Sequence, residues 1–104
     1  MLTLPIKKKW FDMILSGEKK EEYRDLSDYY WVRFMNIWAY PAYWGEPHQI
    51  TFRNGYRKDS PSFVATCTLA MGFGKEEWGA EREKRYYILK ICDIEPQVER
   101  ENKK

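Results

Sequence analysis

The stretch of sequence that decides the fold joins an apolar segment to a charged one and reads Ile14-Leu15-Ser16-Gly17-Glu18-Lys19-Lys20-Glu21-Glu22-Tyr23-Arg24. We expect a helix to end at Gly17, because glycine tolerates the left-handed conformation of a helix cap. Residues 19–25 have the length of a strand. Residues two apart on a strand share a face, so Glu22 and Arg24 can pair. Lys19 is three residues before Glu22, so on a regular strand it would point to the opposite face. It can join the pair only if it lies in the turn after Gly17.

The sequence therefore predicts a cluster of Lys19, Glu22 and Arg24. A glutamate between two cations can act as a general base or a polar anchor, and the cations can bind a phosphate or a developing negative charge. If the chain is an enzyme, these three residues are its catalytic candidates. The alternative is a solvated edge strand, on which lysine and glutamate discourage aggregation.

The same segment resembles a known family. Gly17, Lys19, Glu22 and Arg24 match G-x-K-x-x-E-x-R, the signature of the ASCH domain family, and the resemblance covers about residues 2–25. It implies a PUA-like fold: an α+β domain with a small mixed β-barrel and short flanking helices. It also implies a cleft, lined by the signature residues, that binds RNA or a modified nucleobase or nucleotide.

The resemblance also suggests a hydrolase as an alternative to a binding module. Some small bacterial members of the family are N4-acylcytidine amidohydrolases, which carry a threonine nucleophile at the position of Glu22, and ribonuclease activity is attributed to others. Glutamate cannot replace a hydroxyl nucleophile, so hydrolysis here would need Glu22 to activate water while Lys19 stabilises the oxyanion. A later acid, Glu76, Glu77 or Glu81, would join them. A third alternative is an adaptor that contacts proteins through its aromatic surface.

Length and composition set the broad class. The chain has 104 residues, enough for one core, and we expect one domain over residues 1–96 and a charged tail over 97–104. The net charge of +2 argues neither for nor against nucleic acid. No apolar run could span a bilayer, and Cys67 and Cys92 are expected to be reduced, so we expect a cytoplasmic protein.

The remaining pattern predicts the order of the elements. We expect strands at 2–6, 19–25, 38–44, 50–53, 63–71 and 86–94, and helices at 7–16 and 27–36, the first with a buried face of Trp10, Met13 and Ile14. Ser27 should cap the second helix. Asn54-Gly55 predicts a tight hairpin with a short returning strand, and residues 75–85 a loop or a marginal helix.

Other residues are candidate ligand contacts because of their charge or their rings. Lys7, Lys8 and Lys9 begin a helix, where the dipole disfavours cations, and could contact phosphates. Bases could stack on exposed aromatic residues, and Trp44 and Tyr56, with Arg53 close by, are the best candidates. We expect no metal and no cofactor, because His48 is the single histidine and no C-x-x-C pair occurs.

Overall fold

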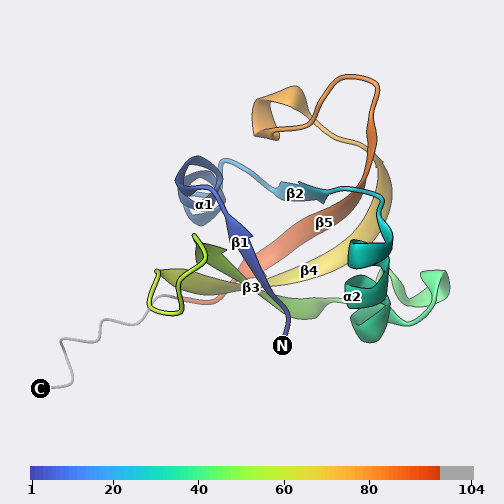
Figure 1. Ribbon diagram of the computed structural model, residues 1–104, viewed down its shortest axis with the longest axis horizontal. Helices are drawn as coiled ribbons and strands as arrows, with labels where there is room; N and C mark the ends of the chain where they lie inside the picture. The colour runs from blue at the N-terminus through green and yellow to red at the C-terminus, as the bar shows by residue number, and fades with distance from the viewer. Residues whose placement is uncertain (97–104) are drawn as a thin grey trace, which may run out of the picture.

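A computed structural model describes residues 1–96 and arranges them as five strands, two α-helices and two 3-10 helices (Figure 1). The predicted tail, residues 97–104, lies outside the described residues. In chain order the elements are β1 (Thr3–Ile6), α1 (Lys8–Leu15), β2 (Glu21–Arg24), α2 (Asp28–Trp38), η1 (Pro41–Tyr43), β3 (His48–Asn54), β4 (Ser62–Phe73), η2 (Glu76–Trp78) and β5 (Arg85–Ile94).

The strands form one mixed sheet in the order β1-β3-β4-β5-β2, which curls into a half-barrel (Figure 1). β1 runs parallel to β3, and the other neighbours are antiparallel. The edge strands β1 and β2 are not paired with each other, but Arg24 of β2 donates a hydrogen bond from Nη2 to the carbonyl of Pro5 in β1, at 2.9 Å. The expected α+β class and curled mixed sheet are thus confirmed, and one arginine connects the two edges.

Alternation along β4 supplies much of the core. Phe63, Ala65, Cys67 and Leu69 are all buried, as the two-residue period predicts, because successive side chains of a strand point to opposite faces. The predicted buried face of the first helix was partly wrong. Phe11 and Ile14 are buried, whereas Trp10 and Met13 are half-buried, because Phe11 packs against the ring of Phe63 at 4.9 Å.

Local signals at the helix ends behave as predicted. The hydroxyl of Ser27 accepts a hydrogen bond from the backbone N–H of Tyr30 at 3.3 Å and so caps α2. Gly17 has a φ of +86°, a left-handed conformation that side chains rarely adopt. The chain then turns, and the backbone N–H of Lys19 donates to the carbonyl of Met13 at 2.9 Å. Lys19 therefore precedes β2, as the cluster requires.

The predicted strand at 38–44 is wrong. α2 continues to Trp38, whose ring is 1% exposed and whose indole N–H donates to the carbonyl of Glu46 at 2.8 Å. Phe34 and Trp38 are four residues apart, so one buried helical stripe runs to the helix end. Pro41 then opens the short helix η1, since its fixed φ suits a first turn.

The predicted tight hairpin at Asn54-Gly55 is also wrong. β3 ends at Asn54 and β4 begins at Ser62, so residues 55–61 form a longer connection, and the short returning strand does not exist. The N–H of Asn54 donates to the carbonyl of Pro61 at 2.8 Å and closes this loop at its base. The loop carries Gly55 and Tyr56 to the mouth of the pocket described below.

Within residues 1–96, no helix has the length and apolar character needed to cross a membrane.

Candidate functional site

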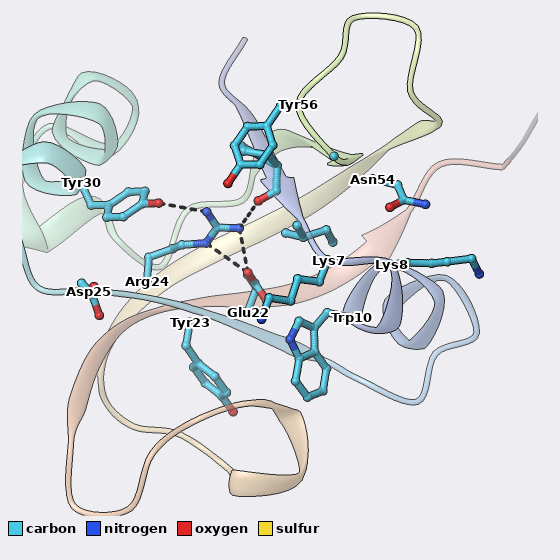
Figure 2. Close-up of a pocket in the computed structure, with 13 residues that line it drawn as sticks. Lys7, Lys8, Trp10, Glu22, Tyr23, Arg24, Asp25, Tyr30, Asn54 and Tyr56 are labelled. Carbon is cyan, nitrogen blue, oxygen red and sulfur yellow. Dashed lines mark hydrogen bonds and ion pairs between the residues drawn. The ribbon is translucent and has the colours of Figure 1, made fainter.

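A pocket of about 560 Å³ opens between α1, β2, the start of α2 and the loop after β3 (Figure 2). This volume falls within the usual range for small-ligand sites. Its polar and aromatic walls come from segments far apart in the sequence. The lining residues are Pro5, Ile6, Lys7, Lys8, Trp10, Glu22, Tyr23, Arg24, Asp25, Tyr30, Asn54, Gly55 and Tyr56.

Arg24 is fixed in the wall of the pocket by a set of hydrogen bonds (Figure 2). Its Nη2 and Nε donate to Glu22 Oε2 at 2.8 and 3.1 Å, and Nη1 donates to the hydroxyl of Tyr30 at 3.0 Å. Burial, the largest single influence, disfavours the charged guanidinium, but Glu22 and Tyr30 together outweigh it and raise the pKa of Arg24. Arg24 therefore stays a cation that orients the Glu22 carboxylate.

Lys19 lies behind Glu22 and is 1% exposed. Its ammonium is 3.3 Å from Glu22 Oε1, donates to the carbonyl of Trp78, and lies 4.8 and 4.9 Å from the ring centroids of Trp10 and Tyr23. Burial lowers the pKa of Lys19, and Glu22 opposes that shift. The predicted Lys/Glu/Arg cluster is confirmed as geometry, and its lysine is enclosed by two rings, a carboxylate and a carbonyl.

The segment around η2 encloses Lys19. Besides the carbonyl of Trp78, the backbone N–H of Lys75 donates to the hydroxyl of Tyr23 at 2.9 Å, and that hydroxyl donates to Glu21 Oε1 at 2.8 Å. Burial raises the pKa of Tyr23, so the phenol keeps the proton that it donates to Glu21. The region predicted as a loop or marginal helix is therefore attached at two points, to Lys19 just before β2 and to Tyr23 within β2.

The predicted ligand contacts divide into two groups. Lys7, Lys8 and Tyr56 line the pocket together with Glu22 and Arg24, and Tyr56 is 88% exposed. The other predicted contacts are absent from its lining: Gly17, Lys19, Trp44, Arg53 and Lys9.

The residues of the second group lie outside the pocket lining, in the following surroundings. Trp44 is half-buried against the core, with its ring 6.3 Å from that of Tyr87, so the prediction of an exposed ring was wrong. Arg53 is half-buried on β3. Lys9 turns to Trp10, with its ammonium 4.7 Å from a ring centroid. Gly17 acts through its conformation, which carries Lys19 under the pocket.

None of the three later glutamates lines the pocket. Glu76 pairs with Arg82 at 2.9 Å, Glu81 lies 3.9 Å from Lys84, and Glu77 is exposed. The second carboxylate in the lining is that of Asp25, directly after β2. The expectation that a later acid joins the cleft is therefore wrong in this structure.

Sequence reasoning missed the aromatic walls, Trp10 and Tyr30. Its helical spacing predicts Trp10 as core, yet Trp10 is half-buried and lines the pocket. Tyr30 lies four residues before Phe34, on the buried stripe of α2, and its spacing alone does not distinguish a pocket wall from core. The amphipathic character of both rings was the available signal, since a ring with a polar tip suits the boundary between core and pocket.

The thiols and the histidine are the other candidate reactive groups, and none of them lines this pocket. Cys67 is buried and Cys92 exposed, both as free thiols, and burial raises the pKa of Cys67 to about 12. Over residues 1–96, no three His, Cys, Asp or Glu side chains gather in a way that could hold a metal ion. His48 packs against the ring of Trp38 at 5.4 Å.

Comparisons of the chain with models of known families, with curated proteins and with solved structures find no match.

Proposed function

We propose that this protein is a binding module that holds a nucleobase or nucleotide, free or within RNA, in the pocket beside Glu22 and Arg24. The observation that carries the proposal is the fixed Glu22 carboxylate in the pocket lining, held by Arg24 on one oxygen and by Lys19 on the other. A carboxylate accepts hydrogen bonds from base amino and imino groups, as in the recognition of cytosine N4. The resemblance to the ASCH signature supports the same class of ligand.

The rest of the pocket suits the other parts of a nucleotide. Trp10, Tyr30 and Tyr56 offer rings on which a base can stack, which is the usual way that proteins hold unpaired bases. Lys7 and Lys8 both line the pocket, and Figure 2 shows the Lys7 side chain extending toward Glu22 and Trp10, where its cation can meet a phosphate, whereas that of Lys8 points away. The ammonium of Lys8 forms an ion pair with Asp12 Oδ2 at 2.6 Å, whereas Lys7 has no ion-pair partner within residues 1–96. Lys7 is therefore the better phosphate contact.

The burial of Lys19 favours binding over hydrolysis. A lysine that stabilises an oxyanion must reach the substrate, but this ammonium is 1% exposed and donates to Glu22 and to Trp78. A hydrolase using Lys19 and Glu22 is the second candidate, favoured by the lowered pKa of Lys19, which suits a group that exchanges protons. It requires the segment around Trp78 to move away from Lys19.

The proposal is tested by titrating nucleoside monophosphates, with and without N4-acetylation of the cytosine, into the protein while following tryptophan fluorescence. Trp10 lines the pocket and should report the ligand. Lys7→Ala should weaken binding, whereas Lys9→Ala, a matched change two residues later in the first turn of α1, should not. Equal affinities for the two variants and the wild type would contradict the proposed site.

Mass spectrometry of the same mixtures, with acylated nucleosides and a short RNA included, separates the two candidates. A binding module leaves every ligand unchanged. A product that forms with the wild type and is lost with Lys19→Ala would establish the hydrolase instead.

A further inference from the structure

A second aromatic surface begins where the pocket ends. Tyr29 of α2 is 57% exposed, and the guanidinium of Arg33, one helical turn later, lies 3.4 Å from the centroid of its ring. Arg33 also donates from Nη1 to the carbonyl of Tyr29 at 3.0 Å, which holds the guanidinium in place. The pair is a preformed stack of a ring and a planar cation on the surface.

This stack is continuous with the pocket through Tyr30. The rings of Tyr29 and Tyr30 meet edge to face at 5.0 Å, and Tyr30 itself lines the pocket and binds Arg24. On its other side Tyr30 stacks on the buried ring of Phe34 at 5.7 Å. Tyr30 is therefore held from both sides, and a ligand that leaves the pocket along α2 next meets the Tyr29–Arg33 stack.

Cations flank the same path on both sides, although the carboxylates of Glu22 and Asp25 also line the pocket between them. Lys7 and Lys8 line the α1 side of the pocket and Tyr30 the α2 side (Figure 2), while Arg33 lies beyond Tyr30. Cations at both ends, with rings between them, complement a chain that alternates phosphates and bases. A free nucleoside would use only the middle of this surface.

We infer that the ligand is single-stranded RNA of at least two nucleotides, with one base in the pocket beside Glu22 and a neighbouring base stacked on the Tyr29–Arg33 pair. The inference rests on the proposed function and deepens it from a nucleotide to a polymer. RNA is the nucleic acid whose loops and ends regularly expose unstacked bases to proteins. An apolar protein partner would not explain the cations at both ends.

The test compares a nucleoside monophosphate with an RNA pentanucleotide of random sequence, both measured by titration calorimetry. The pentanucleotide should bind the wild type more tightly. Tyr29→Ala and Arg33→Ala should each weaken pentanucleotide binding by about 5- to 150-fold, the equivalent of one stacked base, and leave monophosphate binding unchanged. Tyr43→Ala is the matched control: it removes another exposed tyrosine, 47% exposed, that is absent from the pocket lining. Circular dichroism checks that each variant is folded.

The possible failures are distinguishable. Equal affinity for the monophosphate and the pentanucleotide would overturn the inference and leave the proposed function standing, whereas binding of neither would overturn both. An equally tight deoxypentanucleotide would overturn the assignment to RNA. If the Tyr29 and Arg33 variants bound RNA normally but eluted at a different molecular mass in size-exclusion chromatography, the surface would be a protein interface and the inference would be wrong.

Discussion

Replacing Glu22 with glutamine should destabilise the protein by an amount that depends on pH. The change keeps the shape of the side chain but removes the negative charge between Lys19 and Arg24. Lys19 is 1% exposed, so its ammonium cannot recover hydration in place of the lost partner. Removing one member of a buried pair costs about 3–5 kcal/mol. This is a large share of the roughly 5–15 kcal/mol by which a domain is stable.

The pH dependence follows from Lys19. The folded-state pKa of Lys19 lies below the ordinary value of 10.5, because burial lowers it more than Glu22 raises it. Between those two values the unfolded chain binds more protons than the folded one, so stability rises with pH. Without Glu22 the folded pKa of Lys19 falls further. The deficit of Glu22→Gln is therefore larger at pH 7 than above the folded-state pKa of Lys19, because a neutral Lys19 no longer needs a counter-ion.

The assay is urea unfolding followed by tryptophan fluorescence at pH 7 and at pH 10, with the wild type measured at both. Glu18→Gln is the matched control, since Glu18 is exposed and the change should stay within about 0.5 kcal/mol. A loss below about 1 kcal/mol for Glu22→Gln at pH 7, or a loss of the same size at both pH values, would show that Glu22 is not the counter-ion on which buried Lys19 depends.

Three further predictions concern the thiols, the cap and a glycine. A thiol reagent should label Cys92 in the folded protein and Cys67 only after unfolding, because Cys67 is fully buried and burial raises its pKa to about 12. Ser27→Ala should cost about 1 kcal/mol in urea unfolding, since the cap of α2 is lost. Gly79→Ala should cost about 1–2 kcal/mol by the same assay, because Gly79 has a φ of +105° and a Cβ there would lie 3.0 Å from the ring of Trp10.

Each of these three has its own control. Ser27→Gly should lose only a few tenths of a kcal/mol, since glycine is also accepted at a cap. Gly45→Ala should be close to neutral, because nothing lies within 4 Å of a Cβ there and its φ is not positive. Labelling of both thiols at equal rates in the folded protein would contradict the burial of Cys67. If Gly79→Ala left the free energy of unfolding unchanged, this turn would accept alanine without strain and the prediction would be wrong.

The cluster was predictable because local geometry fixes it. Glu22 and Arg24 share a strand face, and Gly17 allows the turn that brings Lys19 to them. Ser27 and the alternation of β4 were predictable for the same reason, since capping and the two-residue period depend on neighbours in sequence.

The environment of the cluster was not predictable from the sequence. The carbonyl that accepts a hydrogen bond from the Lys19 ammonium belongs to Trp78, 59 residues away, and Arg24 donates to the carbonyl of Pro5 across the open side of the sheet. The order of strands in the sheet determines such partners, and the spacing of residues in the sequence does not reveal that order. The errors at 38–44 and at Asn54-Gly55 arose when tertiary packing of Trp38 and loop closure by Pro61 overrode local propensity.

Arg24 connects the fold to the proposed function. One guanidinium joins the two edge strands, which are not paired with each other, orients the Glu22 carboxylate and holds Tyr30 between the pocket and the surface of α2. A ligand in the pocket therefore meets groups that are already in place, which reduces the ordering that binding must impose.

The pocket beside Glu22 and Arg24 is the proposed ligand site, and a two-dimensional amide NMR titration of the labelled protein with nucleoside monophosphates tests it most directly. The shifts should saturate and centre on the amides of Glu22, Arg24 and Gly55. Shifts confined to the strands away from the pocket, or no shifts at millimolar ligand, would contradict the proposed site.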